Sequence, residues 1–156
     1  MQANISEQAG DIRNLFLKYY DELLGIDVCF EDFENELSNL ENLYSHPRGD
    51  LLLLVEGQDI LACVALVRID QRLCEMKRLY VLPEYRGRGL GRMLAEAIIK
   101  KAIQSGYLNM RLDTLDGLKE ALNLYQSLGF REIPAYLENV PVKLVYLQLD
   151  LENEGI

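Results

Sequence analysis

The sequence predicts an α/β fold of the α+β kind, in which a mixed β-sheet carries helices on both faces of a single domain. With 156 residues, of which 49% are hydrophobic, the chain suits one domain spanning residues 1–156. Apolar runs of strand length alternate with stretches of helical periodicity. The predicted order is two helices, three strands, a helix, a strand, a helix and two strands, which favours a single mixed sheet.

The N-terminal part is predicted to form two helices. Apolar side chains recur at helical spacing over residues 9–24, and Gly25 ends that pattern. Residues 31–43 repeat the spacing among many carboxylates, until the segment HPRG at 46–49 breaks it. Any strand before the first helix is confined to residues 1–5.

Three strands follow the two helices. Residues 51–56 (LLLLVE) and 60–69 (ILACVALVRI) are joined by a Gly-Gln-Asp turn, which is typical of an antiparallel hairpin of buried strands. Residues 73–82 (LCEMKRLYVL) form the third predicted strand, and Pro83 ends it.

The second half of the chain contains the strongest helical pattern, which begins at Leu90 and ends at Gly106. Apolar residues recur there every four positions. The remaining predicted elements are a strand at 109–115, a helix at 117–128, and strands at 130–133 and 142–149.

Composition excludes several classes of protein. The chain has 16 basic against 25 acidic residues, and this acidic balance disfavours a nucleic-acid partner. No apolar run approaches the roughly 20 residues that cross a bilayer, so we expect a cytoplasmic protein without a membrane partner. The three cysteines (Cys29, Cys63 and Cys74) form no CxxC pair, which argues against disulfides and against a metal site. We expect Cys74 to serve packing and not to form an acyl-enzyme.

A glycine-rich turn at residues 85–92 (YRGRGLGR) lies between a predicted strand and the strongest helix. Glycines at a helix N-terminus expose backbone amides and the positive end of the helix dipole, an arrangement that binds phosphate. The turn lacks the Lys-Ser or Lys-Thr of a P-loop, and Arg92 stands where the dinucleotide fingerprint requires glycine. These two common phosphate loops are therefore excluded.

The remaining pattern, Arg86-x-x-Gly89-x-Gly91, resembles the pyrophosphate-binding motif of the GNAT superfamily of N-acetyltransferases. A second segment, ALNLY at 121–125 followed by Gly129-Phe130, is similar to the AxxLYxxxGF signature of that family. The resemblance covers residues 51–149 and implies a GNAT-like acyl-CoA N-acyltransferase fold, with acetyl-CoA as cosubstrate and no metal.

The resemblance also implies a cofactor site. The third strand would separate from its parallel neighbour, so that its free backbone groups pair with the pantetheine arm, while the turn would hold the pyrophosphate. Many family members carry an asparagine seven residues before the tyrosine, where this chain has Leu118. The implied cofactor-binding residues are Leu79, Val81, Arg86, Gly87, Arg88, Gly89, Leu90, Gly91 and Arg92.

Acetyl transfer to an amine needs a base, an oxyanion donor and a proton donor for the thiolate. Glu75 is the candidate base, directly or through water, and the Leu79 amide could stabilise the oxyanion. Tyr125, which the resemblance places near the sulfur, is the candidate donor to the thiolate. Two alternatives stay open: Glu75 could be an ion-pair partner of Lys77 or Arg78, and Tyr125 could be a core residue.

The predicted function is therefore transfer of an acetyl group from acetyl-CoA to a primary amine of a small molecule or peptide. The alternative is a non-catalytic acyl-CoA-binding sensor or scaffold, which would need neither Glu75 nor Tyr125. The first 50 residues contain 11 acidic and three basic side chains, which favours a cationic acceptor. The resemblance also implies that residues 134–141 help to shape the acceptor site, and a homodimer stays open.

Overall fold

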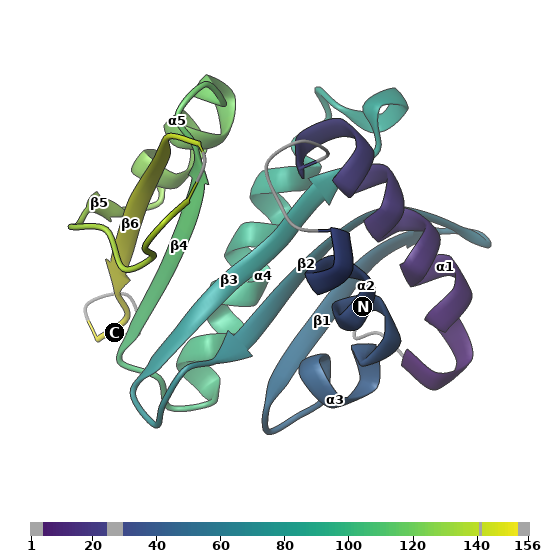
Figure 1. The fold of residues 1–156 in the computed structure, drawn as a ribbon, viewed down its shortest axis with the longest axis horizontal. Coiled ribbons are helices and arrows are strands. Elements are labelled where there is room, and N and C mark those ends of the chain that lie inside the picture. Colours follow the sequence, from purple (N-terminus) through teal and green to yellow (C-terminus); the bar gives the residue numbers. More distant parts are fainter. Residues whose placement is uncertain (1–4, 25–29, 141, 153–156) are drawn as a thin grey trace.

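The computed structural model describes residues 5–24, 30–140 and 142–152, which are organised around one six-stranded sheet (Figure 1). The strand order is β1-β2-β3-β4-β6-β5. Only β3 and β4 are parallel; the other neighbouring strands are antiparallel, so the predicted mixed sheet is confirmed. The strands are β1 (Gly49–Glu56), β2 (Asp59–Arg68), β3 (Leu73–Val81), β4 (Asn109–Leu115), β5 (Arg131–Glu132) and β6 (Leu144–Asp150).

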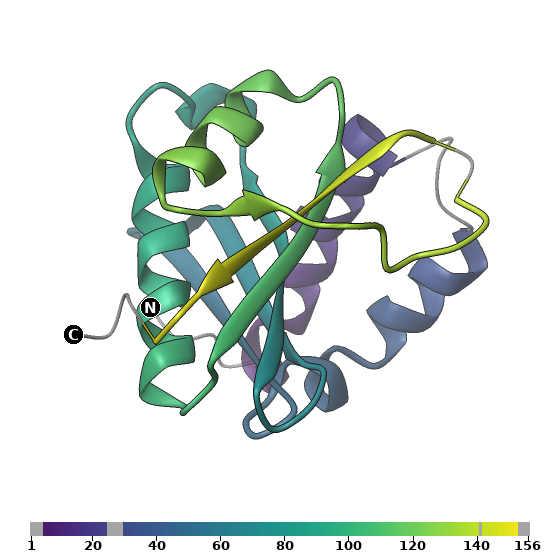
Figure 2. The same ribbon diagram turned by 90° about the vertical axis from the view of Figure 1, so that its left-hand side faces the viewer.

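Helices cover both faces of the sheet, as predicted. One face carries α4 and α5, and the other carries the N-terminal helices α1 to α3 (Figures 1 and 2). Of the residues 1–5 to which any first strand was confined, Ile5 lies in α1 and is helical, and residues 1–4 fall outside the described residues. The helices are α1 (Ile5–Tyr19), the π-helical turn η1 (Tyr20–Leu24), α2 (Phe30–Ser38), α3 (Leu40–Tyr44), the 3₁₀ turn η2 (Pro83–Tyr85), α4 (Leu90–Gln104) and α5 (Lys119–Ser127).

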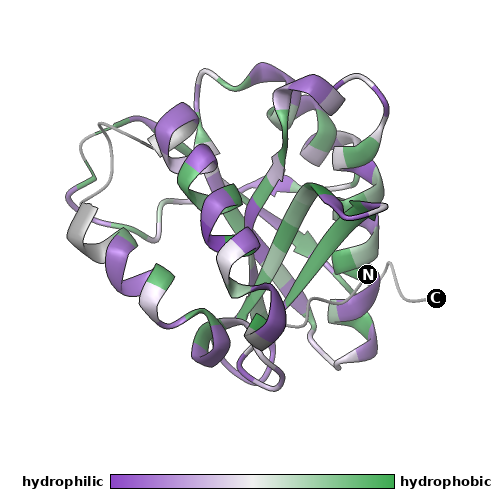
Figure 3. Cartoon of the chain, turned by 90° about the vertical axis from the view of Figure 1, so that its right-hand side faces the viewer, coloured by the Kyte–Doolittle hydropathy of each residue, from purple (hydrophilic) through white to green (hydrophobic). Residues whose placement is uncertain are grey.

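The apolar strand β1 explains how the sheet is buried on both sides. Leu51 and Leu53 point into the core beneath α1 to α3, whereas Leu52 and Leu54 pack toward α4. Figure 3 shows these apolar strands behind N-terminal helices that carry many hydrophilic residues. An apolar run without alternation therefore indicates a strand that is covered on both faces.

Three predicted elements differ from the structure. The helix predicted at 9–24 begins at Ile5 and becomes π-helical over Tyr20–Leu24. The helix predicted at 31–43 is divided at Asn39, because Ser38 Oγ and Asn39 Nδ2 donate to the carbonyls of Glu34 and Asn35 at 3.0 and 2.8 Å. Such side-chain bonds compete with the continuing helical ladder. The strand predicted at 130–133 is shortened to the two residues of β5.

The feature that positions the site is the separation of β3 from β4. Their pairing is limited to Leu73–Asn109, Cys74–Met110 and Glu75–Arg111. Beyond that point the two strands diverge in Figure 1, and each continues without the other as a hydrogen-bonding partner. The predicted splay of the third strand is thus present.

A β-bulge at Arg78 redirects the end of β3. Cys63 pairs with Tyr80 and Ala65 with Lys77, so two residues of β3 lie opposite one residue of β2. Arg78 has a φ of +58°, a left-handed conformation that non-glycine residues adopt at some cost. Because the bulge resets the alternation of side chains, Leu79 packs toward α4 while Tyr80 packs toward α1.

Candidate active site

The space between the diverging strands is a cleft of about 1060 Å³. Its walls are the later part of β3 and the end of β4, and the glycine-rich turn and α5 close it along one side. Side chains from α1 and from the connection between β5 and β6 also line it. Figure 2 shows that this connection extends on the side of the sheet where the N-terminal helices lie. The volume is sufficient for a large cofactor together with a small acceptor.

The glycine-rich turn has the backbone of an anion site. Gly87 and Gly89 have φ values of +81° and +75°, and Gly89 is the N-cap of α4. The first helical hydrogen bond runs from Met93 N to Gly89 O at 3.1 Å, so the amides of residues 90–92 precede the helical ladder. A Cβ atom at Gly89 would meet no heavy atom within 4 Å, so the glycine is required by its backbone conformation and not by crowding.

The Arg86 side chain is engaged by protein groups. Its Nε donates to Val81 O at 2.9 Å, and its two terminal nitrogens donate to the Glu22 carboxylate at 2.8 and 2.7 Å. The hydrogen bonds from Arg86 hold the pKa of Glu22 below its usual range. The other arginines of the turn also have acidic partners: Arg88 with Glu56 at 3.6 Å and Arg92 with Glu96 at 2.9 Å.

These pairs change the expected charge of the turn. Three arginines in one turn would add positive charge around a phosphate site, but acidic neighbours offset that charge in the structure. The pairs are solvent-exposed, so they contribute little and can exchange partners. The backbone amides of residues 90–92, which precede the helical ladder, are the stronger basis for anion binding.

Leu79 and Val81 lie on the free edge of β3 and line the cleft, as the predicted role requires. Both side chains are half-buried and pack against the core beneath α4. Their backbone groups face a region where β4 no longer pairs. An extended ligand there could make hydrogen bonds like those of an added strand.

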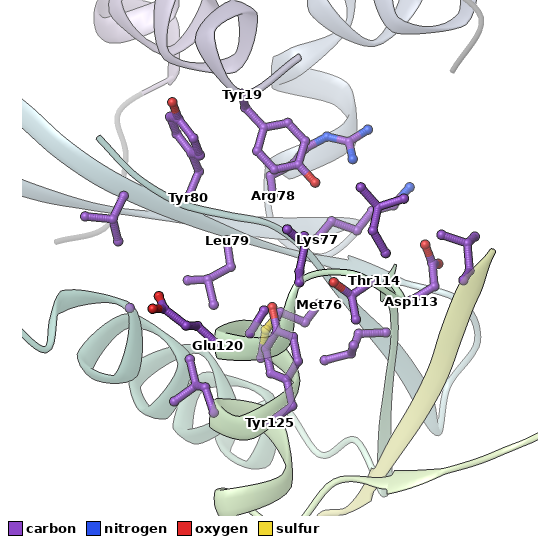
Figure 4. Close-up of a pocket in the computed structure, with 18 of the residues that line it drawn as sticks. Tyr19, Met76, Lys77, Arg78, Leu79, Tyr80, Asp113, Thr114, Glu120 and Tyr125 are labelled. Carbon is purple, nitrogen blue, oxygen red and sulfur yellow. The ribbon is translucent and has the colours of Figure 1, made fainter. Parts of the chain in front are cut away.

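Tyr125 lies at the base of the cleft, and its oxygen points into the cleft (Figure 4). The ring is buried and packs edge-on against Phe130, with centroids 5.8 Å apart. This contact explains the spacing of the tyrosine and phenylalanine in the second motif. The hydroxyl has no hydrogen-bond partner among the described residues, and burial raises the pKa of Tyr125, so the group remains protonated.

Glu75 lines the opposite part of the cleft and is buried. Its Oε1 accepts a hydrogen bond from Arg111 Nε at 2.9 Å, and its Oε2 lies 3.6 Å from Lys77 Nζ. The ion-pair alternative is therefore present for Lys77, whereas Arg78 pairs with Glu36. Both carboxylate oxygens of Glu75 face cations.

The comparisons with known proteins agree with this site. A family model for the Acetyltransferase (GNAT) family matches residues 11–130. An uncharacterised N-acetyltransferase of Schizosaccharomyces pombe is 38% identical over 151 residues, covering 96% of this chain and 92% of that protein. The chain belongs to the GNAT family of acetyltransferases. It is therefore an acyltransferase, and the predicted family and enzyme class are confirmed.

Solved structures show the same GNAT fold. A GNAT acetyltransferase from Staphylococcus aureus matches with a TM-score of 0.82 at 23% identity, covering 97% of both chains. The Campylobacter jejuni N-acetyltransferase PseH, solved in complex with acetyl coenzyme A, matches with a TM-score of 0.67 at 22% identity, covering 96% of this chain and 97% of that chain. The predicted fold class is confirmed.

The structure of this GNAT chain adds cleft residues that were not predicted from the sequence: Tyr19, Arg78 and Asp113. Asp113 accepts a hydrogen bond from Tyr136 Oη at 2.9 Å, which ties the connection after β5 to β4. The sequence contains one signal that could have identified Asp113, because the segment NMRLDTL alternates polar and apolar residues. Such a strand has one polar face, here the face toward α1.

Two cysteines of this GNAT chain, Cys63 and Cys74, are not among the residues that line the cleft. Cys63 and Cys74 are buried and free, and burial raises the pKa of each thiol to about 12. Neither forms a thiolate readily at neutral pH, which agrees with a packing role. Cys29 lies outside the described residues.

Residues 5–24, 30–140 and 142–152 hold no cluster of three or more side chains suited to a metal ion. No helix in them has the length and apolar character needed to cross a bilayer.

Proposed function

We propose that this GNAT chain, acting as one domain over residues 1–156, transfers the acetyl group of acetyl-CoA to a primary amine of a small molecule or peptide. The observation that carries the proposal is the combination, in one cleft, of a free β3 edge, a glycine-rich helix N-terminus and the Tyr125 hydroxyl. The solved complex of PseH with acetyl coenzyme A supports the choice of acetyl-CoA as cosubstrate.

Two parts of the chain would hold the cofactor. The backbone amides of the glycine-rich turn would bind the pyrophosphate, because they lie at the positive end of α4. The free edge at Leu79 and Val81 would pair with the pantetheine arm. Leu118 lines the cleft but has no side-chain donor or acceptor, so binding there relies on backbone groups.

Acetyl-CoA supplies a thioester, and three groups of the chain would serve its reaction with the amine. Glu75 would accept the proton of the ammonium, through water, since both its oxygens already face cations. The Leu79 amide would stabilise charge on the carbonyl oxygen. As the carbon–nitrogen bond forms and the carbon–sulfur bond breaks, Tyr125 would donate a hydrogen bond or proton to the thiolate.

The first test is calorimetric titration of the purified protein with acetyl-CoA, with CoA, ATP and NAD as comparisons. Micromolar binding of the two CoA species alone is the expected result. No binding of acetyl-CoA, or equal binding of ATP, overturns the proposal. Release of free CoA thiol on addition of amines then separates catalysis from binding alone.

A Glu75→Gln variant tests the proposed base. The expected result is a lower turnover with acetyl-CoA affinity retained, because Glu75 lies away from the glycine-rich turn. Full activity in this variant excludes Glu75 as the base. The unfolding temperature must be measured alongside, since the change also breaks the pairs to Arg111 and Lys77.

A further inference from the structure

Charged residues alternate on one face of the two diverging strands. On β3 the order is Glu75 then Lys77, and on β4 it is Arg111 then Asp113. Glu75 and Arg111 are register partners and form an ion pair. If the strands stayed paired, the next cross-strand pair on this face would be Lys77 with Asp113, also of opposite charge.

The divergence of β3 from β4 prevents the Lys77–Asp113 pair. Pairing ends at Glu75–Arg111, and Lys77 Nζ lies 3.6 Å from Glu75 Oε2 instead. Arg111 also has other partners, since its Nε donates to Glu75 and its guanidinium lies 4.0 Å from the centroid of the Tyr136 ring. Neither Lys77 nor Arg111 forms an ion pair with Asp113, and Arg78, which lies on the same side of β3, pairs with Glu36.

Asp113 is therefore a carboxylate without a cation. Among the described residues it has no ion-pair partner, and its one side-chain hydrogen bond is the donation from Tyr136 Oη to Oδ2. It is half-buried and lines the cleft. In Figure 4 it projects from β4 on the side of the cleft away from Glu120. A partly desolvated carboxylate in this position favours a cationic ligand.

Its place in the cleft suits the acceptor and not the cofactor. Asp113 lies on the face of β4 opposite to α4, whereas Leu79 and Val81, on the proposed cofactor edge, pack toward α4. Asp113 and Tyr125 nevertheless line the same cleft (Figure 4). A ligand at Asp113 is thus near the proposed reaction centre.

We propose that Asp113 binds the ammonium group of the acceptor, so that the preferred acceptors are aliphatic amines that are cationic at neutral pH. This inference rests on the acetyl transfer proposed above and specifies its substrate class. Aromatic amines of similar size, which are neutral at pH 7.5, would gain nothing from Asp113. The ion pair and its hydrogen bond supply the discrimination between the two classes.

The test compares Asp113→Asn with wild type, using benzylamine, 1,4-diaminobutane and lysine amide as aliphatic acceptors and aniline as the neutral one. Asparagine keeps the size of the side chain and an oxygen for Tyr136. Asp116→Asn is the matched control, because Asp116 pairs with exposed Lys143 and does not line the cleft. CoA release at varied acceptor concentration gives KM and kcat separately.

We expect Asp113→Asn to lower kcat/KM for the aliphatic acceptors by about 10- to 100-fold, mainly through KM, as the loss of a charged hydrogen bond predicts. Activity toward aniline, acetyl-CoA affinity and the activity of Asp116→Asn stay at wild-type values. Equal losses for aliphatic and aromatic amines, an unchanged KM, or no reaction of any aliphatic amine with wild type overturns the inference. Acetyl-CoA titration of the same samples shows separately whether the proposed function fails.

Discussion

Arg78 on the β3 bulge and Glu36 on α2 form a partly buried, bidentate ion pair, with Arg78 Nε donating to Glu36 Oε2 at 2.9 Å. The side chains are 14% and 12% exposed, respectively. Burial alone would raise the pKa of Glu36, but the hydrogen bonds and charge of Arg78 lower it below the usual value. Tyr44 Oη donates to the same carboxylate at 2.9 Å. The pair therefore fastens the N-terminal helices to the strand that lines the cleft.

Replacing Arg78 with alanine should destabilise the protein by about 3 kcal/mol, because Glu36 is left buried without its cation. Urea unfolding measures the change. Arg13→Ala is the matched control, since Arg13 and Glu34 form an exposed pair at 3.6 Å, and its effect should stay below about 1 kcal/mol. Equal effects of the two variants would contradict a structural role for the buried pair.

Gly89→Glu should abolish acetyl-CoA binding, because it places a carboxylate at the proposed pyrophosphate site. The positive φ of +75° adds a cost of about 1–2 kcal/mol in stability. Gly106→Glu, at a φ of +90° after the C-terminal end of α4, brings a comparable backbone cost away from the cleft and should bind normally. Calorimetric titration distinguishes them, and normal binding by Gly89→Glu would place the cofactor elsewhere.

Gly91→Ala should retain acetyl-CoA binding. A Cβ atom at this position would lie 3.9 Å from both Leu124 Cδ2 and Val81 Cγ2, which is an ordinary contact. The φ of Gly91 is not in the left-handed region, so alanine brings no backbone strain. A large loss of affinity in the same titration would mean that the ligand approaches this backbone more closely than the structure implies.

Tyr125→Phe should lower kcat by about 100-fold while acetyl-CoA affinity changes little, because only the donor to the thiolate is removed. Burial raises the pKa of Tyr125 above the ordinary value of about 10, so the neutral, donating form persists in alkaline buffer. Wild-type kcat should therefore show no loss from this group between pH 7 and 10. If the kcat of Tyr125→Phe matched that of wild type, Tyr125 would have a packing role and no catalytic one.

Cys63 should resist alkylation at pH 8 in the folded protein and react on unfolding. Burial raises its pKa to about 12, so almost no thiolate is present. Because the folded-state pKa lies above the unfolded value of about 8.5, this group favours the folded state below that pH. That contribution is lost as the pH rises toward 12. Site-resolved mass spectrometry after iodoacetamide treatment measures the reaction, and rapid labelling of the native state would contradict the burial.

The sequence predicted the elements whose signal is local. The apolar runs of β1 and β2 and the periodicity of α4 identified those elements within one or two residues, and the glycine spacing identified the phosphate turn. The break at Asn39 was missed because it depends on side-chain bonds that the apolar pattern does not record. Two neighbouring polar residues sufficed to overcome that pattern.

The missed site residues depend on contacts between distant segments. Arg78 adopts a positive φ without being glycine, so nothing in its own sequence neighbourhood marks the bulge. Asp113 gains its importance only because β3 leaves β4 before Lys77 can reach it. The pair of Glu75 with Lys77 was among the alternatives drawn from the sequence, but the hydrogen bond from Arg111 depends on another strand. Residue type and spacing identified the candidate, but tertiary structure decided its partners.

The early end of β3–β4 pairing makes the stability of the protein depend on its cofactor. Along residues 76–81 the sheet lacks one neighbour, and the proposed pantetheine arm would take its place. At a free concentration about 100 times its Kd, such a ligand would add about 2.7 kcal/mol to the free energy of unfolding. The concentration of acetyl-CoA would then affect how readily the protein is proteolysed. At low acetyl-CoA a larger fraction of the protein would be unfolded, and its degradation would be faster.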